Sequence, residues 1–206
     1  MQATYFPIDA RLRRAARVPG IAEAPDRRVT ALEWATLLGA GITASLLTNL
    51  LRLRLGIPGS SIVFVAFPLA LGFALVPRRG SGFVMAGGAF ATSAALGALG
   101  VRLDGVGAQA SLLLTGPLLD LALRQGGEGW RLYGAFIAAC TASNACAFAV
   151  RLLARLAGIG GAGHGGGGGR SAAAWLPEAV WTYGFAGLLA GLISVAAWFQ
   201  LRNRPT

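Results

Sequence analysis

Few side chains of this chain have the type and spacing that acid–base or nucleophilic chemistry needs. Asp120 lies four residues before Arg124 in the stretch TGPLLDLALR, and this spacing lets a carboxylate meet a guanidinium on one helix. A proton relay would need a second acid nearby, but no other acidic residue lies inside an apolar segment away from its ends. We therefore expect Asp120 and Arg124 to form a structural ion pair near a helix end, where the arginine can reach toward water.

The remaining reactive groups do not combine into a catalytic or metal-binding pattern. The single histidine, His164, lies in the glycine run GIGGAGHGGGGGR, and one imidazole cannot coordinate a metal ion alone. Cys140 and Cys146 lie on different faces of one predicted helix, so we expect neither a disulfide nor a zinc site. The chain has no GxxxxGKS/T loop for ATP, and it lacks the serine setting and membrane histidine of an intramembrane protease. An intramembrane enzyme is therefore the minor alternative, and we predict no catalytic residue, metal or cofactor.

The composition identifies lipid as the solvent of this chain. Of the 206 residues, 55% are hydrophobic and 13% are charged, whereas about a quarter are charged in ordinary soluble domains. Crossing the roughly 30 Å hydrocarbon layer takes about 20 residues of helix. Six apolar segments approach this length, near 31–51, 60–77, 83–101, 106–123, 132–153 and 178–200. The sequence therefore predicts an all-α fold, a polytopic membrane protein with six transmembrane helices in one bundle.

Three polar segments accompany the predicted transmembrane domain, which extends over residues 30–201. Residues 1–29 carry six arginines and three prolines without the continuous apolar run of a secretory signal peptide, and they predict a cytoplasmic arm. Residues 158–170 are glycine-rich and predict a flexible loop, and residues 202–206 form a short cytoplasmic tail. Thr30 and Glu33 have the spacing of a capping box, which predicts that the first transmembrane helix begins here.

All 18 basic residues are arginine, and their distribution predicts the orientation of the bundle. With the N-terminus in the cytoplasm, twelve arginines lie on the cytoplasmic side and six on the other side. Because cytoplasmic loops of membrane proteins carry an excess of positive charge, this distribution favours both termini in the cytoplasm. We therefore expect a multi-pass protein of the cytoplasmic (inner) membrane. The partner of its arginines is then the lipid bilayer and not a nucleic acid.

In this orientation, polar side chains gather toward the outer half of the bundle. Asn144 is the most informative, because a carboxamide in hydrocarbon needs hydrogen-bonding partners. We predict a substrate pocket that is open to the outside and lined by Asn49, Ser60, Ser61, Gln109, Asn144, Trp181 and Tyr183. The alternative is that Trp181 and Tyr183 are ordinary interfacial anchors and that Asn144 only bonds a neighbouring helix.

Strips of small residues on three segments predict close contacts between helices, since helices in lipid associate through close packing. The strips are Ala40 and Ala44 in the first segment, Gly87, Ala91 and Ala95 in the third, and Gly187 and Gly191 in the sixth. Each strip could pack inside the bundle or contact a separate membrane protein, and the sequence leaves both alternatives open.

The order of these features resembles the membrane-embedded S-components of energy-coupling factor transporters, including the cobalt/nickel-type members. The resemblance rests on the strip of Ala40 and Ala44, the turn LGIPGSSIVF, the helix end ALVPRRGSG, and the stretch TGPLLDLAL. It implies six helices with both termini in the cytoplasm and a transmembrane coupling subunit in contact with Ala40 and Ala44. It also implies a pair of ATPases that supply energy, and a vitamin or metal ion bound in the outer pocket.

The N-terminus departs from the metal-type members of this family. Those members begin with Met-His and have further histidines, whereas this chain begins with Met1 and Gln2, so a metal ion is not the expected cargo. The resemblance therefore implies the substrate-binding subunit of an ATP-driven uptake transporter for a micronutrient, a vitamin or a related small molecule. The alternative is a non-catalytic membrane scaffold or assembly protein without cargo.

Overall fold

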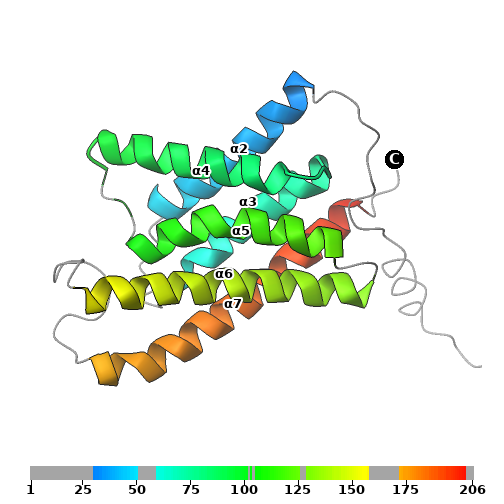
Figure 1. Cartoon of the computed structure of the whole chain (residues 1–206). Coiled ribbons are helices and arrows are strands. Elements are labelled where there is room, and N and C mark those ends of the chain that lie inside the picture. The colour runs from blue at the N-terminus through cyan, green and yellow to red at the C-terminus, as the bar shows by residue number, and fades with distance from the viewer. Residues whose placement is uncertain are drawn as a thin grey trace, which may run out of the picture.

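The computed structural model describes residues 30–50, 59–101, 103, 105–125, 129–157 and 172–202 of the chain. The predicted arm 1–29, the glycine-rich loop 158–170 with His164, and residues 203–206 of the predicted tail lie outside the described residues. The described part consists of the helices α2 (Ala31–Leu50), α3 (Ser61–Leu75), α4 (Ser81–Ala98), α5 (Val106–Gln125), α6 (Trp130–Leu156) and α7 (Ala172–Arg202) (Figure 1). The predicted all-α fold is confirmed.

Five of these helices are long and apolar enough to cross a membrane: α2, α4, α5, α6 and the part of α7 from Leu176 to Leu201. The sixth, α3, has only 15 residues, which corresponds to about 22 Å of helix against the roughly 30 Å of a hydrocarbon core. Its length has a local cause. Gly59 precedes it with a φ of 82°, and Pro77 follows it, which disfavours a helical conformation at Val76.

The first helix begins where the sequence predicts. The Thr30 amide donates to Glu33 Oε2 at 2.8 Å, and the Glu33 amide donates to Thr30 Oγ1 at 3.3 Å. These two hydrogen bonds form the predicted capping box and satisfy amides that a helix N-terminus otherwise leaves without partners. The same carboxylate also forms an ion pair with Arg78 at 3.2 Å, so the start of α2 is joined to the turn between α3 and α4.

The helices form two layers that cross at an angle. In Figure 1, α4, α5 and α6 run side by side, and α2, α3 and α7 cross behind them, with the start of α2 above α4 and the start of α7 below α6. Helix α3 contacts each of the other five helices, and it lies between α2 and α7. Successive helices run in opposite directions, so α2 begins and α7 ends at one end of the bundle, which we call the terminal end. The opposite end, where α2 ends and α7 begins, is the loop end.

Glycine allows the closest helix contacts. A Cβ atom on Gly82 of α4 would collide with the carbonyl oxygen of Gly116 on α5, and a Cβ atom on Gly116 would collide with the carbonyl oxygen of Gly82. On α7, Gly187 and Gly191 pack against the α6 backbone, so this predicted strip serves the packing of the bundle itself. Small residues let backbones approach this closely, which is how helices gain contact area in lipid.

The core changes character along the bundle axis. Toward the terminal end, aromatic rings from the first turns of α6 pack against rings from the last turns of α7. Tyr133 stacks on Phe199 with ring centroids 4.6 Å apart, and Phe136 lies 6.0 Å from Trp198. Trp198, Phe136 and Phe73 of α3 are fully buried there. The half of the bundle toward the loop end is instead rich in buried polar side chains.

Candidate functional site

The candidate site is this polar half of the bundle, which extends from the middle of the helices to the loop end. It takes polar side chains from five helices, and most of them are almost fully buried. The buried members are Ser45, Thr48 and Asn49 of α2, Ser93 of α4, Ser111 and Thr115 of α5, Ser143 and Asn144 of α6, and Tyr183 of α7. The predicted gathering of polar side chains in one half of the bundle is therefore present in the structure.

One network joins α2, α4 and α5. Asn49 donates from Nδ2 to the Ser45 carbonyl oxygen at 2.9 Å and to Ser93 Oγ at 3.3 Å. Ser93 Oγ in turn donates to Gln109 Oε1 at 2.7 Å. Asn49 is only 2% exposed, so its carboxamide is satisfied by protein groups and not by water. The network connects two of the predicted site residues, Asn49 and Gln109, through a serine that sequence reasoning missed.

A second network joins α6, α7 and the turn before α3. Asn144 donates from Nδ2 to the carbonyl oxygen of Tyr183 at 2.6 Å and to that of Gly59 at 3.4 Å. Arg151 donates from Nη1 to the Tyr183 hydroxyl at 3.2 Å. Two further predicted site residues, Asn144 and Tyr183, are therefore in direct contact. Gly59 fits here because a Cβ atom would lie 3.0 Å from the Tyr183 ring.

The middle of the bundle holds a shorter link between α5 and α6. The hydroxyls of Thr115 and Ser143 lie 2.7 Å apart, and Thr115 also donates to the Ser111 carbonyl oxygen at 2.6 Å. These side chains are 0% exposed, so no solvent-sized space touches them. This link between α5 and α6 is therefore closed to solvent.

Two carboxamide atoms of the polar half are buried without a hydrogen-bond partner among the described residues: Gln109 Nε2 and Asn144 Oδ1. Leaving a buried donor or acceptor unpaired costs about 1–3 kcal/mol. Gln109 Nε2 is a donor and Asn144 Oδ1 is an acceptor, so each could form a hydrogen bond with a polar group of a bound molecule. This pair of atoms is the strongest chemical indication of a ligand in the described part of the chain.

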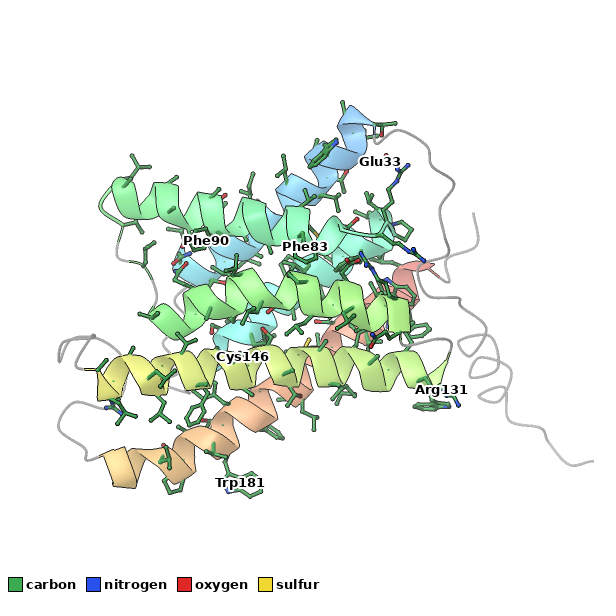
Figure 2. All side chains as sticks on the ribbon, viewed as in Figure 1. Glu33, Phe83, Phe90, Arg131, Cys146 and Trp181 are labelled. Atoms are coloured by element: carbon green, nitrogen blue, oxygen red, sulfur yellow. The ribbon has the colours of Figure 1, made fainter. Side chains whose placement is uncertain are left out.

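The remaining predicted pocket residues are less buried. Ser60 and Ser61 are half-buried at the start of α3, and Ser60 makes no side-chain capping bond. Trp181 is 79% exposed on the outside of α7, and Figure 2 shows its side chain directed away from the bundle. Trp181 therefore does not line the interior. Its placement is that of the interfacial anchor, which was the alternative for this residue.

The small-residue strip of α2 faces the interior of the bundle, whereas the strip of α4 faces outward. Ala44 is fully buried, and Ala40 packs against the core beside Gly72 of α3. The expected partner contact at Ala40 and Ala44 is thus replaced by contact within the bundle. Gly87, Ala91 and Ala95 of α4 are exposed, and nothing lies within 4 Å of a Cβ atom placed on Gly87. Sequence alone could not separate these strips, because their composition is similar.

This difference predicts the outcome of two matched substitutions. Ala44→Leu should destabilise the protein by about 3 kcal/mol, because the added atoms have no space in a packed core. Ala91→Leu should change the free energy of unfolding by less than about 0.5 kcal/mol, because the side chain lies on the exposed face of α4. SDS-induced unfolding of the purified variants in mixed micelles measures both values. Equal stability of the two variants would contradict the burial of the α2 strip.

The Asp120 side chain is placed as its spacing predicts. Its Oδ2 accepts a hydrogen bond from Arg124 Nη2 at 2.7 Å, which confirms the ion pair. The same oxygen accepts from the Gly80 amide at 3.0 Å, so α5 also caps the start of α4, a contact that no local pattern indicates. The carboxylate is 2% exposed, and its Oδ1 is buried without a partner among the described residues.

The other potentially reactive groups do not form a site. Cys140 is buried and Cys146 is exposed, and neither forms a disulfide. Across the described helices and turns, no group of three His, Cys, Asp or Glu side chains is placed to hold a metal ion.

Together, the fold and its polar half define a class of protein: a helical, multi-pass membrane protein with a buried polar cluster in one half of its bundle. Comparison with protein-family models, with curated proteins and with solved structures finds no match. Any more specific function must therefore be argued from the residues themselves.

Proposed function

We propose that this chain is the membrane-embedded substrate-binding subunit of an ATP-driven uptake transporter for a vitamin or related small molecule. Separate coupling and ATPase subunits supply the energy, and both termini lie in the cytoplasm. The observation that carries the proposal is the pair of buried, unpaired atoms Gln109 Nε2 and Asn144 Oδ1 in a polar half supplied by five helices. The similarity in sequence pattern to the S-components supports the assignment of the energy source.

The chemistry of the polar half favours an uncharged, polar substrate. Its buried described side chains are hydroxyls and carboxamides, with the half-buried Arg151 at its edge. Such groups bind a solute through several hydrogen bonds without the large cost of burying an ion. Because Thr115, Ser143 and Asn144 have almost no exposed surface, the helices must separate at the loop end before a solute can enter.

The test is the recovery of a bound molecule with the purified chain. Protein extracted in mild detergent from cells that hold the complete transporter is examined by native mass spectrometry for a co-purifying small molecule. We expect Gln109→Leu and Asn144→Leu to lower its occupancy at least about tenfold, which corresponds to the loss of roughly 1.4 kcal/mol per site. Each variant should lose at most about 1–2 kcal/mol of stability.

Thr43→Val is the matched control. This hydroxyl lies on the exposed face of α2 and donates only to the Gly39 carbonyl oxygen of its own helix. The control should keep the bound molecule. Recovery of the chain without any small molecule, coupling subunit or ATPase would argue against a transport role.

A membrane scaffold without cargo is the second candidate, and the outward strip of Gly87, Ala91 and Ala95 favours it. A helix of another protein could approach this smooth face closely. The same strip is also the contact that we propose for the coupling subunit, in place of Ala40 and Ala44. Ala91→Leu distinguishes the two candidates. If the chain is a transport subunit, this variant should lose its coupling and ATPase partners but still co-purify with its small molecule. If the chain is a scaffold, the variant should lose its partner proteins, and neither it nor the parent protein should co-purify with a small molecule.

A further inference from the structure

The terminal end of the bundle carries a cationic patch, which we define as Arg78, Arg79, Arg124 and Arg131. Arg78 and Arg79 lie in the turn between α3 and α4, Arg124 lies in the last turn of α5, and Arg131 lies in the first turn of α6. Gly80 and Arg124 donate to the same oxygen of Asp120, at 3.0 and 2.7 Å, so the turn and the end of α5 are adjacent. Figure 2 shows Arg131 at this end of the molecule.

The patch turns guanidinium groups toward its outer side, since Arg79, Arg124 and Arg131 are exposed. Two carboxylates pair with arginines of the patch: Glu33 with Arg78, and Asp120 with Arg124. The Asp120 side chain is 2% exposed, whereas its partner Arg124 is 41% exposed. The carboxylate of this ion pair therefore lies beneath the surface, and its guanidinium faces outward.

Arg131 lies in the first turn of α6, where a positive charge destabilises the helix. It is the second residue of α6, whose N-cap Gly129 offers no side-chain cap. The positive end of the helix dipole repels a cation in the first turn and attracts an anion. An anion bound there would be stabilised by the guanidinium and by the helix end together.

Two exposed tryptophans lie at the same end of the bundle as this patch. Trp130, beside Arg131, is 73% exposed and contacts the Tyr133 ring at 5.5 Å. Trp34 at the start of α2 is also exposed. Tryptophan prefers the membrane–water interface, and arginine matches the geometry of phosphate oxygens. We propose that this patch binds the phosphate of an anionic phospholipid headgroup, with Arg131 and the neighbouring Trp130 as its contacts and Arg78, Arg79 and Arg124 adding positive charge.

The experiment compares lipids of different charge on the purified full chain. Delipidated protein in neutral detergent receives phosphatidylglycerol, phosphatidylcholine or inorganic phosphate, and both the retained lipid adducts and the midpoint of thermal unfolding are measured. We expect phosphatidylglycerol to give adducts and to raise the midpoint more than phosphatidylcholine does. Each arginine near an anionic membrane surface contributes about 1 kcal/mol to the free energy of binding, so Arg131→Gln should weaken phosphatidylglycerol binding about fivefold. The double variant with Arg131→Gln and Arg79→Gln should bind this lipid more weakly still.

Arg54→Gln is the matched control, because it removes one positive charge from the connection between α2 and α3. It should leave phosphatidylglycerol binding unchanged, and Arg131→Gln should unfold like the parent protein in phosphatidylcholine. Equal stabilisation by both lipids would overturn the proposal, as would equal loss of binding in Arg131→Gln and Arg54→Gln. Stabilisation by inorganic phosphate to the same extent would overturn it too, because it would indicate a general anion site without a lipid.

Discussion

Gly82→Ala should destabilise the bundle by about 3 kcal/mol, the upper part of the range for overpacked cores. The new methyl group would collide with the carbonyl oxygen of Gly116 on the neighbouring helix. That obstacle is backbone and cannot turn aside, so α4 and α5 must move apart. Their separation would strain the contacts of Asp120, whose Cβ atom lies 3.0 Å from the position of the new methyl group. SDS-induced unfolding in mixed micelles measures the loss.

Gly87→Ala provides the control on the same helix. Nothing lies within 4 Å of a Cβ atom at this position, and alanine is up to about 1 kcal/mol more favourable than glycine inside a helix. This variant should be as stable as the parent protein or slightly more stable. If Gly82→Ala and Gly87→Ala behaved alike, the close approach of α4 and α5 would be contradicted.

Asp120→Ala should also cost about 3 kcal/mol, because it removes two hydrogen bonds to a charged group at a buried site. The Gly80 amide would lose its acceptor, and Arg124 would lose its ion pair. Arg124 can turn toward water because it is 41% exposed, so most of the loss arises at the start of α4. Hydrogen exchange in detergent should therefore show faster exchange in the first turn of α4 than in the loop half of the bundle.

Asp120→Asn distinguishes the hydrogen bond from the charge. Its amide oxygen can still accept from the Gly80 amide, so we expect this variant to keep the slow exchange of α4. Its free energy of unfolding should fall by about 1 kcal/mol, the usual net contribution of one hydrogen bond. Stabilities of Asp120→Ala and Asp120→Asn that both match the parent protein would show that the carboxylate does not join the helices.

The features that sequence predicted well depend on neighbours along one helix. The capping box of Thr30 and Glu33 is separated by three residues, and the ion pair of Asp120 and Arg124 by four. Helical geometry alone brings such residues together. The apolar segments were equally visible, because a helix in lipid needs a long continuous run of apolar side chains.

The features that sequence missed depend on how helices pack. Asn144 meets the Tyr183 carbonyl oxygen across 39 residues, and Asp120 meets the Gly80 amide across 40. No periodicity encodes such pairs. The direction of a small-residue strip has the same origin, since Ala44 and Ala91 are identical in type and differ only in what surrounds them. The sequence thus indicated that polar side chains gather in one half of the bundle, but not that Trp181 lies on its outside, and the pocket itself stays a prediction.

The central position of α3 has a consequence for the order in which the molecule can be completed. Helix α3 emerges from the ribosome second among the described helices, yet it packs extensively against α7, which emerges last. Until α7 has been synthesised, the side of α3 that packs against α7 can be covered only by lipid acyl chains or by insertion factors. A chain interrupted before residue 172 would expose that side permanently, so cellular quality control would have a structural reason to remove unfinished molecules.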